Sequence, residues 1–361
     1  MNDPEVVFAG LLKHIRPEEI PADEDLVSAQ ALEAHLARLD EPHLSLLAGG
    51  DVMLGGRTRK AIAEYGLDYP FEAVRPLLQR SAIGLANLEG PLAQHARKED
   101  RNFSYRVHPR CARILKRAGV NVVNLANNHL LDCGPEGVLE TLEALEAAEV
   151  QAIGAGPNPA AAHVPAILEA GAYRVGLLGY YWNRRTAATP MRPGSAMDSP
   201  PELASDIEAL RPRVDRIVVT FHWGLPYEPV PFPDDRAKAR FAIDCGADVV
   251  IGHHPHVIQP MEIHRGRPIA YSLGNFAFGS ANSRAESLLL GVRFEDARTV
   301  LRWYPLYVKN RDPRVNYQPK LLRGAAATRL LHRLEERSGM RGVLEIGELG
   351  AAMTLPWTEH D

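Results

Sequence analysis

The chain has 361 residues, of which 45% are hydrophobic and 24% charged, the ordinary composition of a soluble globular protein. Its net charge of −4 offers no basic excess for a nucleic-acid partner, and no stretch reaches the roughly 18–20 apolar residues that span a bilayer. Residues 1–20 carry charges throughout and lack the apolar segment of a secretion signal, so we expect a cytosolic (cytoplasmic) protein without a membrane anchor. The three cysteines, at positions 111, 133 and 245, are too widely spaced for a zinc ribbon or a disulfide framework.

Residues 1–42 are expected to be helical, because apolar residues recur at helical spacing between positions 23 and 38. From residue 44 onward, short apolar runs alternate with amphipathic segments. The runs that we predict as buried strands cover residues 44–47, 82–86, 120–125, 174–179, 217–221, 249–251 and 269–271. The segments that we predict as helices cover residues 70–81, 108–118, 136–148, 201–210 and 234–245. This alternation argues for an α/β sheet with helices on its faces.

The later part of the chain changes character. Residues 287–294 and 299–308 have the pattern of a hairpin, which favours mixed or paired sheets over a purely parallel one. Residues 186–201, rich in proline and small side chains, predict a long surface loop, and residues 324–338 predict a charged helix. We therefore divide the chain into a helical N-terminal appendage (1–42), a main domain (43–310) and a helical or irregular C-terminal extension (311–361).

Six short polar motifs each follow directly on one of the predicted strands. They begin at Gly50, Asn87, Asn127, His222, His253 and Ser272. In an open α/β sheet the loops at the carboxyl ends of the strands share one edge, where ligands bind. We therefore expect the motifs to converge on one pocket. They bring an Asp, a Glu, an Asn and several His, which together are an inventory of metal ligands and acid–base groups.

The first three motifs supply two carboxylates and an amide–imidazole pair. Glycines before Asp51 allow a sharp turn that points its carboxylate into the pocket, although Gly-Asp is also a common ordinary turn. Glu89 occupies the same kind of place after the next strand. Asn128 and His129 together suit a divalent ion and a proton-transfer group. Asp132 either orients the His129 imidazole or only turns the chain.

The later motifs are rich in histidine. His222 ends a very apolar strand, where a lone histidine is more often a core residue than a ligand. His253, His254 and His256 place three imidazoles in four residues, and neutral imidazoles around a cation avoid the repulsion that protonation of all three would cause. Asn275, in the last motif, either binds substrate or ties loops together.

Read together, the motifs Gly-Asp-Val-Met-Leu-Gly, Asn-Leu-Glu, Asn-x-Ala-Asn-Asn-His-x-x-Asp-x-Gly, His-Trp-Gly, Gly-His-His-Pro-His and Tyr-Ser-Leu-Gly-Asn-Phe resemble the bacterial capsule-synthesis (CapA-like) family. The best-known members of that family belong to poly-γ-glutamate production. The resemblance covers residues 44–278 and lies within the main domain. The family is in turn similar to the calcineurin-like metallophosphoesterases. This implies a four-layer α/β/β/α sandwich of metallophosphoesterase type with a metal site at the strand ends.

The resemblance also implies roles for individual residues. The implied metal ligands are Asp51, Glu89 in the bridging position, Asn128, His222, His254 and His256. His129 matches the general acid, and His253 is the alternative to His254 as the first member of the closing His-x-His pair. The implied cofactor is a divalent ion, Mn, Fe or Zn, present as one ion, two ions or none.

Three departures from these patterns bear on the metal count. Met53 stands where the phosphoesterases have a ligand histidine in their first motif. Glu89 replaces the bridging aspartate and lengthens its arm. Pro226 stands where the family's usual His-Trp-Gly-x-Glu-Tyr has its glutamate. One of the two metal positions is therefore expected to be weakened.

We consider three functions. The first is a metal-dependent hydrolase of a phosphoester or a γ-glutamyl-type amide, in which His129 protonates the leaving group and Arg57 or Arg106 receives an anionic substrate. The second is an acid–base lyase or cyclase, metal-independent or metal-assisted, that tailors a natural product by dehydration and conjugate addition.

In the second case the clustered carboxylates and histidines, with His253 or His254 among them, act as acid and base, and aromatic residues such as Trp223 and Tyr227 line the rim. The substrate in either case is a small molecule or is peptide-like. The third function is a non-enzymatic subunit of a capsule-type machine.

Overall fold

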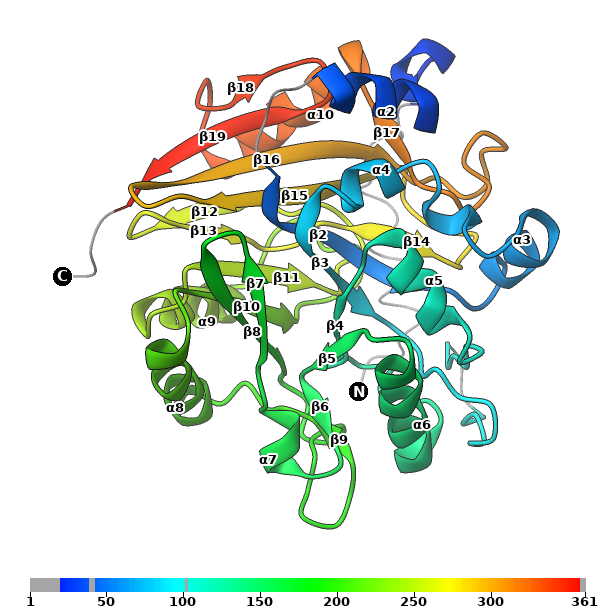
Figure 1. Ribbon diagram of the computed structural model, residues 1–361, viewed down its shortest axis with the longest axis vertical. Helices are drawn as coiled ribbons and strands as arrows, with labels where there is room; N and C mark the ends of the chain where they lie inside the picture. Colours follow the sequence, from blue (N-terminus) through cyan, green and yellow to red (C-terminus); the bar gives the residue numbers. More distant parts are fainter. Residues whose placement is uncertain (1–19, 39–42, 101–102, 358–361) are drawn as a thin grey trace.

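The computed structural model of the protein describes residues 20–38, 43–100 and 103–357, which form a mixed α/β fold around two sheets (Figure 1). The strands of the larger sheet are β1 (Leu26–Val27), β2 (Leu44–Met53), β3 (Ser81–Leu88), β4 (Val122–Asn124), β5 (Gln151–Ile153), β14 (Asn275–Phe278), β15 (Glu286–Phe294), β16 (Arg298–Tyr307), β17 (Lys320–Leu322), β18 (Glu345–Ile346) and β19 (Ala351–Pro356). The strands of the smaller sheet are β7 (Ala166–Ala170), β8 (Tyr173–Tyr181), β10 (Arg216–His222), β11 (Val249–His253), β12 (Met261–His264) and β13 (Arg267–Ala270). Both sheets contain parallel and antiparallel pairs, which confirms the predicted α/β class with mixed sheets.

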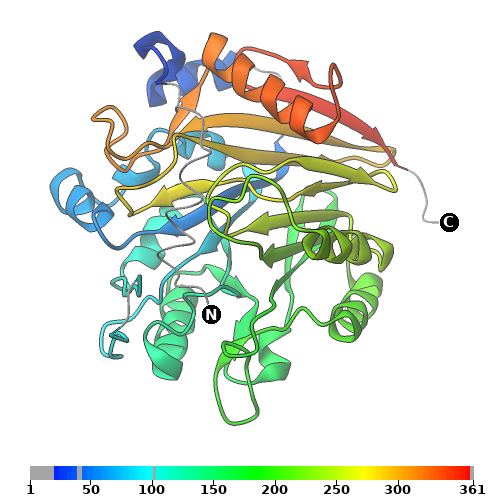
Figure 2. The ribbon, with the colours of Figure 1, turned by 180° about the vertical axis from the view of Figure 1, so that it is seen from behind.

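The helices lie on the outer faces of the sheets and beside them. They are α2 (Ala29–Arg38), α3 (Thr58–Tyr65), α4 (Arg75–Leu78), α5 (Cys111–Ala118), α6 (Gly134–Ala147), α7 (Pro159–Ala162), α8 (Pro200–Leu210), α9 (Pro233–Asp244) and α10 (Gly324–Ser338). In Figure 1, α8 and α9 flank the smaller sheet, while α5 and α6 lie on the side of the larger one. The view from behind in Figure 2 shows α10, which contacts β12 and β16.

Alternating side chains along the strands divide the apolar core into layers. Leu46 of β2 and Val218 of β10 belong to the cluster between the two sheets. Leu47, on the opposite face of β2, packs with Leu115 of α5 in a second cluster. Val219 belongs to a third cluster, between the smaller sheet and helices α8 and α9. Because a strand presents successive side chains to opposite faces, one strand serves two layers. This packing supports the four-layer order, which stays a prediction.

Parallel pairing brings the polar motifs to one edge. β3 lies between β2 and β4 and is parallel to both, and β10 lies parallel to β8 and β11. In this register Asp51 pairs with Asn87 on one side and with Asn275 of β14 on the other. His222 pairs with His253 in the smaller sheet. The carboxyl ends of strands from both sheets therefore carry the motifs.

The glycines before Asp51 do not turn the chain, and the expectation that they would is wrong. β2 continues through Gly49 and Gly50 to Met53. A Cβ atom on Gly50 would lie 1.8 Å from the carbonyl oxygen of Gly274. The glycine is needed so that this segment can approach closely enough for Asp51 N–H to donate to Gly274 O at 3.0 Å.

Several predicted elements need correction. The helix expected over residues 23–38 begins only at Ala29, because residues 26–27 form β1 and pair with β17. The helix expected over 70–81 divides into a 3-10 turn (Tyr69–Phe71) and the short α4. The loop expected over 186–201 includes β9 (Gly194–Ser195), which pairs with β6 (Ala155–Gly156), and the start of α8.

The C-terminal part was expected to be helical or irregular, but residues 320–322 and 351–356 are strands of the larger sheet. β19 pairs with β16 along six residues, since an amphipathic segment there completes the sheet beside the hairpin.

Residues 1–19 of the expected N-terminal appendage lie outside the described residues. The division of the chain at residues 42 and 310 stays a prediction. Among the helices that the structure describes, none is long and apolar enough to cross a bilayer.

Candidate functional site

Asn87, at the end of β3, is the polar centre of the site. Its side-chain amide donates to Asp51 Oδ1 at 2.8 Å and to Glu89 Oε1 at 3.3 Å, and it lies 3.2 Å from His222 Nδ1. Its carbonyl oxygen accepts from the side-chain amide of Asn124 at 3.1 Å. All of these side chains are buried. The network links three strands of the larger sheet to the smaller sheet, because His222 ends β10.

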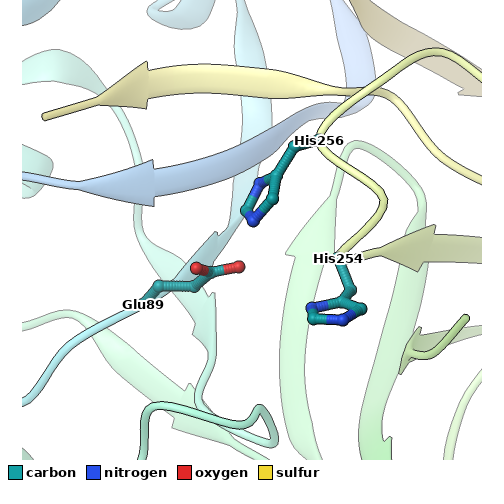
Figure 3. Close-up of side chains that lie close together, drawn as sticks. All are labelled: Glu89, His254 and His256. Atoms are coloured by element: carbon teal, nitrogen blue, oxygen red, sulfur yellow. The ribbon is translucent and has the colours of Figure 1, made fainter. Parts of the chain in front are cut away.

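Two groups of possible ligand atoms meet at this edge, and Glu89 belongs to both. One group consists of Glu89, His254 and His256, with its atoms within 4.8 Å of one another, and Figure 3 shows these three side chains around a common space. The other group consists of Asp51, Glu89 and His222, with the same spacing. Asn128 joins them, since its Oδ1 lies 2.9 Å from His222 Nε2. The structure thus brings together all six residues that the resemblance implies as metal ligands.

Several buried atoms of the site have no hydrogen-bond partner among residues 20–38, 43–100 and 103–357. They include Glu89 Oε2 and His254 Nδ1, and both ring nitrogens of His253. Buried polar groups are normally paired, because an unpaired one forfeits its hydration. His253 is 1% exposed and its Nδ1 lies 3.8 Å from Asp51 Oδ1, but it belongs to neither ligand group. Of the two alternatives in the histidine motif, His254 is the one grouped with His256.

The two carboxylates differ in their electrostatics. Burial raises the pKa of Glu89 well above its ordinary 4.5, and the nearby Asp51 charge adds to this. Burial also opposes ionisation of Asp51, but the hydrogen bond and charge of His256 outweigh it and lower the Asp51 pKa. His256 Nδ1 lies 3.0 Å from Asp51 Oδ2. Burial lowers the pKa of His256, but Glu89 and Asp51 raise it to about 9, so His256 is protonated without an ion and must lose that proton to ligate one.

His222, His253 and His254 stay neutral. Burial lowers the pKa of His253 to about 4 and that of His254 to about 3, with the charge of His256 adding to the second shift. Burial and the neighbouring His254 lower the pKa of His222 well below its ordinary 6.5. A neutral imidazole keeps a lone pair for a cation, so this arrangement suits metal ligation.

The loop that carries the histidine cluster has an unusual backbone. His254 has φ +99° and His256 has φ +55°, both in the left-handed region that non-glycine residues seldom adopt. Such conformations cost of order 1–3 kcal/mol and persist where the surrounding structure holds them, often at ligand sites. A hydrogen bond helps to hold this backbone: the N–H of His254 donates to Asp51 Oδ2 at 3.3 Å.

His129 is placed beside the ligand groups. Its Nε2 lies 3.7 Å from Glu89 Oε2, and its Nδ1 lies 2.8 Å from Asp132 Oδ2. The same Asp132 oxygen accepts the backbone N–H of Tyr105 at 2.6 Å, and the Tyr105 ring lies 4.4 Å from that of His129. Asp132 therefore holds the His129 ring instead of only turning the chain, and the imidazole presents Nε2 to the site.

The predicted substrate-binding residues lie in different environments. Asn275 is buried, and its Oδ1 lies 3.0 Å from His256 Nδ1, so it orients a histidine. The Tyr227 ring lies 6.2 Å from that of His256. Trp223 is wrong as a rim residue: it is 1% exposed, stacks on Phe221 and donates its indole N–H to Tyr271 O at 2.9 Å. It lies in the core because it follows the buried strand β10 directly.

The two arginines predicted to receive an anion are exposed. Arg57 precedes α3, and Arg106 donates to the carbonyl of Ala96 at 3.3 Å. Their role as anion receivers stays a prediction. A further arginine, Arg284, lies with its guanidinium carbon 4.8 Å from the Tyr227 ring, which is 6.2 Å from that of His256. Sequence reasoning missed Arg284 because it lies in a connection without a motif. The sequence motifs include Asn87, in Asn-Leu-Glu, but their chemistry assigned it no role.

Comparisons with known proteins agree with the motifs. Residues 45–280 match the family described as bacterial capsule synthesis protein PGA_cap. The chain is 33% identical over 283 residues to the capsule biosynthesis protein CapA of Bacillus anthracis, covering 75% of this chain and 69% of that protein. It is 30% identical over 246 residues to the PGA biosynthesis protein CapA of Bacillus subtilis, covering 67% and 65%.

A third relative is a probable polyglutamine synthesis accessory protein of Mycobacterium tuberculosis, 32% identical over 223 residues, with 57% of this chain and 59% of that protein covered. The matched residues 45–280 include every implied metal ligand. The family match and the Bacillus anthracis relative together confirm the resemblance: the chain belongs to the CapA-like family of bacterial capsule synthesis proteins.

Proposed function

We propose that this CapA-like protein is a metal-dependent hydrolase of a phosphoester or a γ-glutamyl-type amide. The observation that carries the proposal is the position of Glu89, which is buried and belongs to both ligand groups. One of its carboxylate oxygens has no hydrogen bond within the part of the chain that the structure describes. An ion held there would satisfy that oxygen.

The residues present fit a divalent ion. Carboxylate, amide and imidazole donors together suit Mn, Fe or Zn. Glu89 Oε2 and His254 Nδ1 have no hydrogen-bond partner among the described residues, and an ion would give buried atoms of this kind a partner. The residues that would hold it are Asp51, Glu89, Asn128, His222, His254 and His256. When bound, the ion would supply Lewis-acid polarisation of a substrate oxygen and an activated water.

The protein's own contribution to the reaction is proton transfer and positioning. His129 is our candidate general acid, because Asp132 holds Nδ1 and leaves Nε2 directed at the Glu89 side of the site. The side-chain amide nitrogen of Asn128 lies 3.2 Å from the same Nε2 and can donate to it once His129 has given up its proton there. A proton held at His129 Nε2 can pass to the leaving group of a substrate bound over Glu89.

The names of the relatives bear on the substrate. Two are named for capsule or PGA biosynthesis and one for polyglutamine synthesis as an accessory protein, which supports a substrate containing amide-linked acidic or amide residues. The accessory name also keeps the non-enzymatic alternative open to test. The lyase or cyclase alternative loses one support, because the buried Trp223 cannot line a rim.

The test is the metal content of the full chain, purified without a His-tag or added metal, by elemental mass spectrometry. We expect about one or two Mn, Fe or Zn ions per chain and their loss in Glu89→Ala and His254→Ala. His264→Ala is the matched control, since His264 pairs with Asp244 at 2.8 Å away from the site. A site that stays empty after soaking in each metal would contradict the proposal. Bis(p-nitrophenyl) phosphate and γ-glutamyl p-nitroanilide then test the two bond types.

A further inference from the structure

Three side chains outside the ligand groups border the same face of the site, and each comes from a different connection. Tyr105 lies between β3 and α5, Tyr227 between β10 and α9, and Arg284 between β14 and β15. Phe278 lies among them, with its ring 6.2 Å from Tyr105 and 4.8 Å from His256. These residues form a border along the His129 and His256 side of the site.

Tyr105 is held against His129 by its backbone. Its N–H donates to Asp132 Oδ2, the oxygen that also holds the His129 ring. Gly90 leaves room for this position, because a Cβ atom on it would lie 2.8 Å from Tyr105 Cβ. Its φ of +94° also favours glycine there. The phenol ring is therefore fixed beside the candidate general acid.

Tyr227 is fixed in a similar way beside the histidine cluster. Its backbone lies in the left-handed region at φ +65°, and its N–H donates to the carbonyl of Pro255 at 2.7 Å. Pro255 lies between His254 and His256 in the sequence, so this hydrogen bond fixes the Tyr227 backbone relative to the histidine cluster. The strained backbone indicates that the surrounding structure holds Tyr227 in place.

Arg284 stands over the Tyr227 ring, and its neighbours in sequence are anchored. Ser283 Oγ donates to Val308 O at 2.8 Å and accepts the backbone N–H of Asn310 at 2.9 Å. Val308 N–H in turn donates to Ala285 O at 2.7 Å. The residues on both sides of Arg284 are therefore held by hydrogen bonds, and the contact of its guanidinium with the Tyr227 face is a cation–π interaction.

The three residues offer hydrogen-bond donors beside buried carboxylates. A phenol carries its proton at neutral pH, so Tyr105 and Tyr227 each bring a hydroxyl donor. Arginine presents a planar fork that matches carboxylate and phosphate oxygens. Asp51 and Glu89 would repel an anionic group of a substrate. Hydrogen-bond donors beside them can bind that group and offset the repulsion.

We propose that Tyr105, Tyr227 and Arg284 form a recognition edge for an anionic oxygen group of the substrate, either a carboxylate or a phosphate. This inference rests on the proposed function, since it names the substrate class of the same site. Tyr105 borders the candidate general acid, and Arg284 with Tyr227 borders His256. An anion bound by the edge would hold the reactive bond over the ligand groups.

The test is calorimetric binding of two probes, inorganic phosphate and glutarate, to the full chain as purified. Because hydrogen bonds to charged groups are the strong ones, we expect Arg284→Gln to weaken binding about tenfold or more, and Tyr105→Phe and Tyr227→Phe about threefold each. Arg284→Lys keeps the charge but loses the planar fork of donors, so its affinity should lie between those of the wild type and Arg284→Gln. Arg59→Gln, an exposed arginine of α3, is the matched control.

Phosphate binding alone supports a phosphoester substrate, and glutarate binding alone supports a carboxylate-bearing one. No binding by the wild-type chain, or equal binding by wild type and Arg284→Gln, would overturn the recognition edge. Thermal unfolding shows whether each variant is folded, and metal content is measured on the same samples. A chain without metal whose anion binding depends on Arg284 would overturn the hydrolase proposal alone. A metal-bearing chain whose anion binding ignores Arg284 would overturn this inference alone.

Discussion

Asn87 donates its side-chain amide to Oδ1 of Asp51 at 2.8 Å, across the register pair that joins β3 to β2. The same amide reaches Glu89, while the carbonyl oxygen accepts from neighbouring asparagines. A neutral amide has both donors and acceptors, so it can satisfy two carboxylates without adding charge. The geometry of the candidate site therefore depends on a residue that is itself outside both ligand groups.

Replacing Asn87 with alanine should be strongly destabilising. The change leaves Asp51 and two buried asparagines short of a partner, and each such loss costs about 1–3 kcal/mol, so we expect the free energy of unfolding to fall by about 3 kcal/mol. Urea denaturation measures this. Asn282→Ala, at an exposed asparagine, should change it by about 0.5 kcal/mol or less. Equal effects of the two substitutions would argue against the network.

Replacing Asp132 with asparagine should impair turnover while leaving metal content unchanged. Asp132 touches His129 and Tyr105 but belongs to neither ligand group. Loss of its charge weakens the hold on His129 Nδ1, and we expect kcat on bis(p-nitrophenyl) phosphate to fall about 10- to 100-fold. The pH profile of kcat should shift as well, which a merely structural role would not produce. A loss of metal together with activity would instead indicate a folding defect.

Trp223 should matter for stability and not for substrate affinity. Trp223→Phe removes a buried hydrogen bond to Tyr271 O and leaves a small cavity, so we expect the free energy of unfolding to fall by about 2–3 kcal/mol. The KM for the same phosphodiester should stay unchanged. Trp182→Phe is the control, since Trp182 is 48% exposed and its replacement should cost little stability. A raised KM in Trp223→Phe would restore the rim assignment.

The ion pair of Asp312 should make stability sensitive to acid. The hydrogen bond from Arg314 holds the pKa of Asp312 well below its ordinary 3.8, despite partial burial. A carboxyl whose pKa is lowered by folding contributes stability above its unfolded value and loses it as pH falls through the folded value. We expect Asp312→Asn to cost about 1–2 kcal/mol at pH 7 and much less at pH 2.

Urea denaturation at the two pH values measures the Asp312 effect. Asp296→Asn is the matched control, because Asp296 accepts from the hydroxyl of Tyr173 at 2.7 Å, as Asp312 accepts from Tyr307 at 2.8 Å, but is not paired with Arg314. A cost for Asp312→Asn that is the same at pH 7 and at pH 2 would contradict the role of the charge.

Local patterns were sufficient for the strands and for the donor inventory. The apolar runs before Asp51, Glu89 and His222 predicted buried strands, and each strand lies there with somewhat different ends. The strand-end motifs predicted convergence at one edge, the family resemblance implied six ligand residues among them, and the structure places these residues near one another. This was possible because side-chain periodicity and chemical type are properties of short segments.

Other features depended on contacts between segments distant in sequence. The sequence predicts a helical or irregular extension over residues 311–361 and misses the six residues of β19, because their strand pairing depends on β16, about fifty residues earlier. Gly50 was read as a turn because nothing local shows that the Gly274 carbonyl packs against it. Arg284 carried no motif, and its place over Tyr227 is set by the anchoring of its neighbours.

The sequence by itself determined the family and the mixed α/β class, and it supplied the candidate ligand residues, since these follow from local pattern and residue type. Only the tertiary structure decided which histidine stands with His256, which tryptophan is buried, and that Asn87 connects the site. Those outcomes follow from the packing of one sheet on the other, which sets burial, register and side-chain direction together and which no single segment encodes.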